Sequence, residues 1–161
     1  MQKYKLTEET ISYMGKTLYR IEAVRDFENV KAGEKGGYIQ SEDNLSQDGD
    51  CWIYDNALVR DSAEVSDNAR VRGNAQVSGS AEIGSDADYI CLQGFGPQNQ
   101  HTTMFRCKDG TVFVVCGCFE GTLDEFAAWA KQPHGDNNKY GKEYELCVEL
   151  ARVYFGVPIE K

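Results

Sequence analysis

The chain has 161 residues and a formal net charge of −9, with enough apolar and aromatic side chains for a folded protein. This length suits one domain or two small ones. Both halves are acidic and no basic run exceeds two residues, which argues against non-specific binding to nucleic acid and against binding to an anionic membrane.

The N-terminal segment has the pattern of a strand pair. Residues 3–25 carry apolar side chains on both sides of Gly15, which predicts a hairpin with its turn at that glycine. The glycine- and charge-rich segment 26–37 predicts a loop that ends in a turn at Gly36 and Gly37. We therefore expect residues 1–38 to form an N-terminal β cap.

A strict six-residue repeat follows. Each hexad holds an aliphatic residue and, four positions later, an alanine. The aliphatic residues are Ile53, Val59, Val65, Val71, Val77 and Ile83, and the alanines are Ala57, Ala63, Ala69, Ala75, Ala81 and Ala87. A period of six is typical of a parallel β-helix with about 18 residues per coil. We expect the β-helix over residues 39–87, with the aliphatic residues inside, the alanines at the corners, and the Asn, Ser or Asp before each alanine in the unusual corner conformation.

Residues 88–161 predict a separate α+β module in the order β-β-β-α-α. Strands are expected at 89–93, 102–107 and 111–119, with a tight turn at 108–110. Thr122 is a good N-cap for a helix over 123–131, with Glu125 completing a capping box. A last amphipathic helix is expected over about 140–155.

The six cysteines are expected to be reduced. No signal-type segment and no apolar stretch of bilayer length occurs in the sequence, so we expect a cytoplasmic protein. Cys116 and Cys118 lie two apart in an apolar run and are expected to face the core together. His101 and His134 form no paired spacing, so neither a metal site nor a cofactor is expected.

The hexads resemble the hexapeptide-repeat, left-handed β-helix family, whose best-known members are trimeric acyltransferases. The segments 18–21, 30–39 and 49–57 resemble, more narrowly, small bacterial and phage- or prophage-borne β-helix proteins that are often labelled transferases without demonstrated chemistry. The segment 117–126, with His134 and Tyr144, is similar to a small α+β domain of phage proteins. The fold implied is mainly β: a short left-handed parallel β-helix with an N-terminal hairpin cap and a C-terminal β-β-β-α-α module.

The family's catalytic residue has no counterpart in this sequence. Family enzymes use a histidine in or beside the coils as the general base, and no histidine precedes residue 101. The strict repeat also lacks a loop insertion that could build a substrate site. We therefore expect no catalytic residue and no enzyme activity, with acyl transfer kept as an alternative.

Two loops of the C-terminal module combine turn-forming residues with hydrogen-bonding side chains. They could bind a small polar ligand with an aromatic base. Aromatic side chains would stack on the base, amide side chains would hydrogen-bond to its edges, and Arg106 and Lys139 would contact phosphate. The candidate ligand-binding residues are Phe95, Gln98, Asn99, His101, Arg106, His134, Asn138, Lys139, Tyr140 and Tyr144. The alternative is that both segments are ordinary surface loops.

The phage-type resemblance implies a non-catalytic counter-defence protein in the bacterial cytoplasm that sequesters a small nucleotide-like immune signal. The alternatives are an anti-CRISPR-like inhibitor that binds a host defence protein, a structural oligomerisation protein, and a hexapeptide acyltransferase. A short β-helix buries little apolar surface alone, and family members trimerise, so we expect a homotrimer. The apolar stripe of the last helix, with Tyr144, Val148, Ala151 and Phe155, is expected to add a second contact between protomers.

Overall fold

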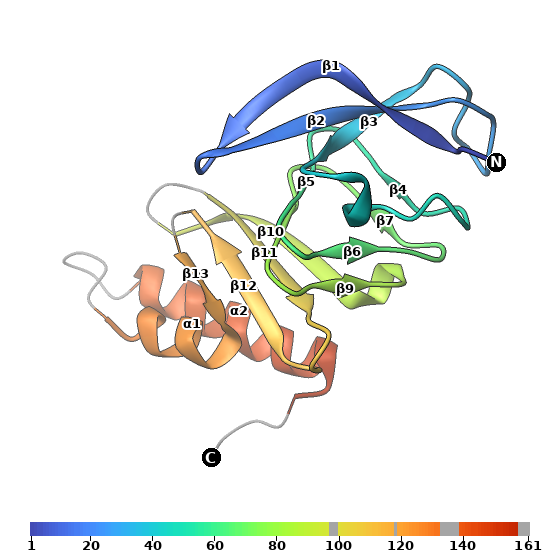
Figure 1. The fold of residues 1–161 in the computed structure, drawn as a ribbon. Helices are drawn as coiled ribbons and strands as arrows, with labels where there is room; N and C mark the ends of the chain where they lie inside the picture. The colour runs from blue at the N-terminus through green and yellow to red at the C-terminus, as the bar shows by residue number, and fades with distance from the viewer. Residues whose placement is uncertain (97–99, 118, 133–138, 158–161) are drawn as a thin grey trace. The chain divides into compact units, whose positions relative to one another are not determined.

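The computed structural model describes residues 1–96, 100–117, 119–132 and 139–157. The chain is mainly β and divides into two compact units, Met1–Asp88 and Tyr89–Lys161 (Figure 1). The predicted hairpin is confirmed in the first unit: β1 (Tyr4–Tyr13) and β2 (Lys16–Ala23) pair antiparallel. Met14 and Gly15 make its turn with φ of 49° and 77°, as expected for a tight hairpin turn.

The predicted turn at Gly36 and Gly37 is wrong. Both glycines lie inside β3 (Lys35–Ile39), which pairs antiparallel with β2 and parallel with β5. A Cβ at Gly36 would lie 2.5 Å from the Ile53 carbonyl oxygen, and one at Gly37 would lie 2.5 Å from that of Ala57. These glycines therefore allow the backbone of β3 to pass close to the neighbouring coils. Sequence alone does not distinguish a glycine with this role from one in a turn.

Six two-residue strands follow the hexad period. They are β4 (Trp52–Ile53), β5 (Leu58–Val59), β6 (Glu64–Val65), β7 (Arg70–Val71), β8 (Gln76–Val77) and β9 (Glu82–Ile83). Each pairs in parallel with the strand eighteen residues away, as Trp52 with Arg70 in β4 and β7. The pairs β5–β8 and β6–β9 have the same offset. The chain thus visits three sheets in turn, because β5 and β8 extend the mixed sheet of β1, β2 and β3, while β4–β7 and β6–β9 are separate parallel pairs. Three successive hexads make one coil of eighteen residues.

The interior of the coils is as the hexads predict, but the corners differ by one residue. The aliphatic positions from Ile53 to Ile83 and the alanines from Ala57 to Ala81 are at most 1% exposed. The left-handed corner residue stands two positions before each alanine, not one as predicted. These residues are Asp55, Asp61, Asp67, Gly73 and Gly79. Asp and Gly suit this position because a short polar side chain, or none, tolerates positive φ.

Hydrogen bonds also join the corner residues of successive coils. The Asp55 carboxylate accepts a hydrogen bond from the Gly73 amide at 3.0 Å, and the Asp61 carboxylate accepts one from the Gly79 amide at 3.2 Å. The repeat ends earlier than predicted, because Ala87 is exposed and lies in the short 3-10 helix Asp86–Asp88. Another 3-10 turn, Glu42–Asn44, precedes the first coil.

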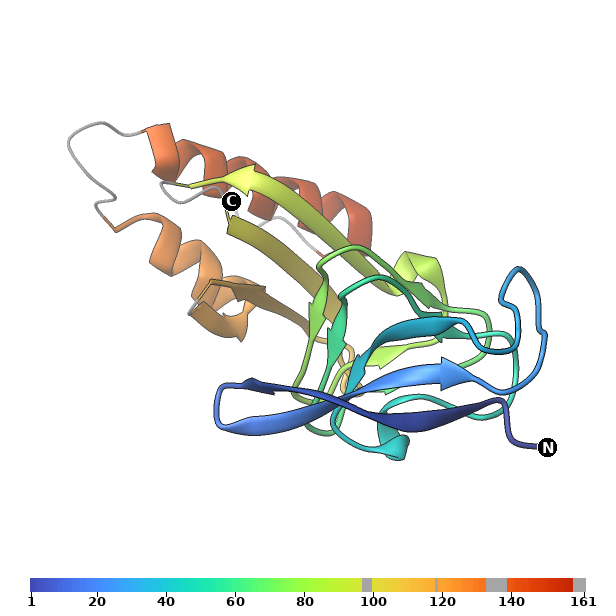
Figure 2. The same cartoon turned by 90° about the horizontal axis from the view of Figure 1, so that it is seen from above.

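The second unit is a four-stranded antiparallel sheet with two helices packed on one face (Figures 1 and 2). Its elements are β10 (Tyr89–Phe95), β11 (Gln100–Arg106), β12 (Val112–Cys116), β13 (Phe119–Thr122), α1 (Leu123–Ala130) and α2 (Lys139–Phe155). The predicted strand 111–119 is thus two strands, because Gly117, with φ of 58°, turns the chain and Phe119 pairs back with Cys116. Thr122 caps α1 as predicted, accepting a hydrogen bond from the Glu125 amide. Cys116 is buried, and Cys118 lies outside the described residues.

The close approach at Gly37 gives a test of this fold. We expect Gly37→Ala to lower the free energy of unfolding by about 1–3 kcal/mol, because the new methyl group would overlap the Ala57 carbonyl and the Ile53 side chain. Urea unfolding followed by circular dichroism measures this. Gly84→Ala is the matched control, because its Cβ would meet only the ends of the flexible Asp67, Asp88 and Ser66 side chains. Equal stability of the two variants would contradict the proposed packing.

Candidate functional site

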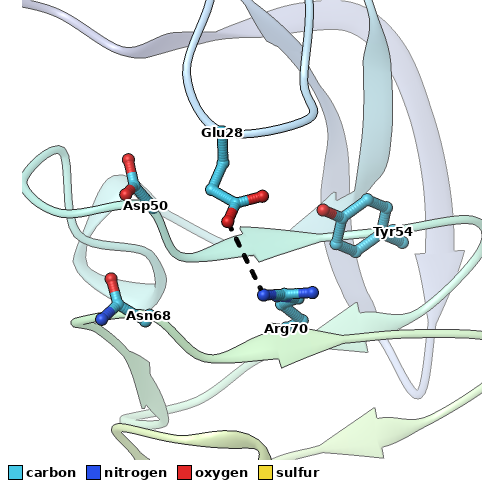
Figure 3. Close-up of a pocket in the computed structure, with 5 residues that line it drawn as sticks. All are labelled: Glu28, Asp50, Tyr54, Asn68 and Arg70. Atoms are coloured by element: carbon cyan, nitrogen blue, oxygen red, sulfur yellow. Dashed lines mark ion pairs between the residues drawn. The ribbon is translucent and has the colours of Figure 1, made fainter.

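Five polar side chains of the first unit line a cavity of about 170 Å³ (Figure 3). Glu28 comes from the loop between β2 and β3, Tyr54 directly follows β4, and Arg70 begins β7. Asp50 precedes β4, and Asn68 lies at the corner before β7. Segments far apart in the sequence therefore meet where the 26–34 loop crosses the β4–β7 sheet.

An aromatic contact places that loop. Phe27 is buried and packs edge-on against Trp52, with ring centroids 5.3 Å apart. Trp52 is the register partner of Arg70 in the neighbouring coil. Glu28, next to Phe27, is thereby held beside Arg70, with its Oε1 3.8 Å from the Arg70 Nη2 (Figure 3).

The backbone at Glu28 is strained. Its φ is 47°, a left-handed conformation that costs a residue with a side chain roughly 1–2 kcal/mol. Neighbouring bonds hold it: the Phe27 and Val30 amides and carbonyls bond reciprocally at 3.0 and 2.8 Å, and the Ala32 amide donates to the Asp26 carboxylate at 2.9 Å. Strain that the surroundings enforce is found most often at functional sites, so this loop is the strongest site candidate of the unit.

The lining of the cavity carries one net negative charge. Glu28 and Asp50 carry two negative charges against one positive charge on Arg70. Arg72 does not line the cavity, but its guanidinium lies 5.0 Å from the Tyr54 ring centroid. Burial raises the pKa of Tyr54, an effect that Arg72 and Arg70 partly oppose. The phenol is therefore protonated at neutral pH and can donate a hydrogen bond.

The side chains that line the cavity can both accept and donate hydrogen bonds. The Glu28 and Asp50 carboxylates accept hydrogen bonds from hydroxyl or amine groups, while Arg70, Tyr54 and the Asn68 amide donate. There is no excess of positive charge to attract a multiply charged anion. The volume is below the roughly 300 Å³ at which pockets for drug-sized ligands begin, so the cavity suits a small molecule or one end of a larger one.

The candidate residues named from sequence all belong to the second unit. Gln98, Asn99, His134 and Asn138 lie outside the described residues. Phe95 packs against the hydrophobic core of this unit. His101 is half-buried in β11, opposite Gln93. Nothing in these positions tests a role in ligand binding.

Arg106 and Lys139 lie at opposite ends of α2. The Arg106 guanidinium donates to the Phe155 carbonyl at 3.1 Å and lies over the Phe155 ring, where it satisfies the helix C-terminus. Lys139 begins the helix, pairs with Glu143 at 3.8 Å and lies over the Tyr140 ring. A helix of this length separates its ends by about 24 Å. The expected contact of these cations with phosphate stays a prediction.

Tyr144 is a core residue. It is 1% exposed and packs on Trp129 and Phe126, with centroid distances of 5.0 and 5.6 Å. Its ring faces are therefore occupied by protein. The predicted contact stripe of the last helix is likewise internal, since Tyr144, Val148, Ala151 and Phe155 all belong to the core cluster of the unit.

Sequence reasoning missed the cavity of the first unit. The positive φ of Glu28 has no sequence signature, because the residue is neither Gly, Asn nor Asp. A usable signal was the offset of eighteen: Trp52 and Arg70 stand directly before the inward aliphatic residues of hexads one coil apart. That offset places an aromatic and a cationic side chain side by side on one outer face.

The described residues contain neither a membrane-spanning helix nor a metal-binding cluster. No helix in them combines the length and the apolar character needed to cross a bilayer. Within the same ranges, no three His, Cys, Asp or Glu side chains gather as ligands for a metal ion.

Comparison with known proteins gives a partial match. No model of a known protein family matches the chain. The chain is 42% identical over 67 residues to a protein named "Uncharacterized acetyltransferase YdcK" from Escherichia coli (strain K12), a match covering 37% of this chain and 21% of that protein. The chain thus spans about a fifth of the length of this relative. The match is consistent with the resemblance to hexapeptide-repeat transferases, and over that partial stretch the name weighs mildly against the expectation of a non-enzyme.

The buried Tyr144 predicts an alkaline loss of stability. Burial raises the pKa of its phenol from 10.0 to about 12. A raised pKa in the folded state stabilises the fold fully below pH 10, and this contribution of roughly 2–3 kcal/mol is lost as the pH rises towards 12. Tyr144→Phe should therefore lose less stability than the natural chain between these pH values, measured by urea unfolding across the range. Tyr154→Phe, which changes a 42% exposed side chain, should keep the natural pH dependence. Identical pH profiles for Tyr144→Phe and the natural chain would refute the prediction.

Proposed function

We propose that the first unit is a short left-handed β-helix that binds a small polyhydroxylated, sugar-like ligand in the cavity of Glu28, Asp50, Tyr54, Asn68 and Arg70. The observation that carries this proposal is the strained Glu28, held beside Arg70 by the contact of Phe27 with Trp52. The handedness rests on the hexads, on the eighteen-residue offset and on the family resemblance.

The ligand class follows from the mixture of groups. A sugar hydroxyl donates and accepts at once, so it can bond a carboxylate and a guanidinium or phenol together. The net negative charge of the lining disfavours a phosphorylated ligand, so a neutral one is favoured. The nucleotide-like immune signal, which the phage-type resemblance implies, is therefore the competing candidate for the ligand. A counter-defence role is a hypothesis that rests on that resemblance.

Acyl transfer is the second candidate. It is favoured by the name of the partial relative and by the Glu28 and Asp50 carboxylates, either of which could act as general base in place of a histidine. A ligand hydroxyl held by Glu28 would then be the acyl acceptor. This reading requires an acyl-donor site, which in the resembled family lies between protomers of a trimer, so it also requires the homotrimer.

A ligand titration separates the candidates. We expect glucose or N-acetylglucosamine to bind the full chain by isothermal titration calorimetry, and Glu28→Gln and Arg70→Gln each to weaken binding roughly tenfold, because each removes a charged hydrogen-bonding partner. Glu82→Gln is the matched control: Glu82 is an exposed outward residue of a coil in another sheet.

Other outcomes would redirect the assignment. Binding of a cyclic dinucleotide that is unaffected by Glu28→Gln would support sequestration of a nucleotide-like signal and overturn the sugar site. Turnover of acetyl-coenzyme A in the presence of a bound sugar would establish the transferase. If neither sugar binds, the proposed ligand class is wrong.

A further inference from the structure

Lys3 is a buried lysine that directly precedes β1. It has no exposed surface, whereas lysine is almost never fully buried unless its charge is paired. Its ammonium donates to neutral acceptors: the Cys51 carbonyl at 2.8 Å, the Cys51 Sγ at 3.2 Å and the Gly49 carbonyl at 3.3 Å. Removing an ammonium from water is costly, so a side chain that only filled this space would be apolar. The bonds that Lys3 makes therefore point to its role.

These bonds support the backbone around one carboxylate of the cavity. Gly49 and Cys51 flank Asp50, so the Lys3 ammonium bonds the carbonyls on both sides of it. The Asp50 amide donates to the Asp67 carbonyl of the next coil at 3.0 Å. Within the part of the chain that the structure describes, the Asp50 carboxylate itself has no bonding partner. Its position in the cavity is therefore set by its backbone.

The same ammonium contacts the loop that supplies the other carboxylate. It lies 5.2 Å from the centroid of the Phe27 ring, and such a cation–π contact is stronger when it is withdrawn from water. Phe27 directly precedes Glu28. The Lys3 carbonyl accepts a hydrogen bond from the Val24 amide at 2.9 Å, where this loop leaves β2. Lys3 thus holds the loop at two points.

Lys3 thereby joins the two segments whose carboxylates face the cavity. Glu28 and Asp50 lie in separate segments and line the cavity together (Figure 3). Their like charges repel each other, and Arg70 pairs with Glu28. A fixed support behind both segments can hold such carboxylates at a set separation, whereas neither segment can do so alone. One buried side chain provides this support.

We propose that Lys3 is a positioning residue of the cavity, whose ammonium holds the backbone beside Asp50 and the Phe27 ring and so sets the separation of the Asp50 and Glu28 carboxylates. This role rests on the sugar-like ligand proposed for the cavity. Lys3 acts through these residues and does not touch the ligand, because it is fully buried and is not one of the residues that line the cavity.

Lys3→Met tests this role, because it keeps an unbranched stem and removes the donors and the charge. We expect its affinity for N-acetylglucosamine in isothermal titration calorimetry to be roughly tenfold lower than that of the natural chain, since the two carboxylates lose their fixed separation. Lys5→Met is the matched control: Lys5 lies two residues further on, and its 53% exposed side chain pairs with Glu22. This variant changes the net charge equally and should leave the affinity unchanged.

A double-mutant cycle separates positioning from a general loss of structure. Lys3→Met should weaken binding roughly threefold or less in a chain that already carries Asp50→Asn, because one of the groups that Lys3 positions is then a weaker acceptor. A purely structural role would weaken binding by the same factor in both chains, and that result would overturn the proposal.

NMR of the ligand-free chain distinguishes failure of this role from failure of the ligand assignment. The amide signals of Glu28 and Asp50 should shift in Lys3→Met and stay in place in Lys5→Met. If they shift but no sugar binds the natural chain, the ligand class is wrong and the support by Lys3 stands. Unchanged signals overturn the proposal. It is also overturned if Lys3→Met and Lys3→Gln, which keeps a donor, both fail to fold, because Lys3 would then be needed for the coil rather than for the cavity.

Discussion

Stacking of one coil on the next at an offset of eighteen residues constrains everything else in the first unit. The bonds that hold it run between coils, as from the Trp52 amide to the Ala69 carbonyl and from the Leu58 amide to the Ala75 carbonyl. The fully buried alanines leave no room for a larger side chain at the turns. Because the strands β4, β5 and β6 each pair with the strand eighteen positions on, Trp52 comes to lie beside Arg70.

The candidate site depends on that neighbour relation. Phe27, from the loop between β2 and β3, packs edge-on against Trp52. The residue after Phe27 must then pass over Arg70 in a left-handed conformation. A stability contribution from aromatic packing thus offsets the strain at Glu28, and the result is a carboxylate held beside Arg70.

The second unit illustrates how a single helix can serve two surfaces. The buried side of α2 packs on α1 and the sheet, while its outer side exposes other apolar residues, among them Leu146 and Val153. The apolar residues of this seventeen-residue helix are spread over more than one face. Its sequence alone therefore does not decide which face is buried. The stripe first expected to contact another protomer is the one that the core occupies.

The sequence by itself determined the hairpin at Gly15, the six-residue period of short strands with buried aliphatic residues and alanines, and the capped helix after Thr122, because each depends on a short-range pattern or a strict period. Only the tertiary structure decided that Gly36 and Gly37 serve close packing, that the left-handed corner precedes the predicted one, and that Gly117 divides a strand. It also decided which residues meet at the cavity: Glu28 and Arg70 are brought together by coil stacking and an aromatic contact, and no local pattern encodes a meeting of segments so far apart in the chain.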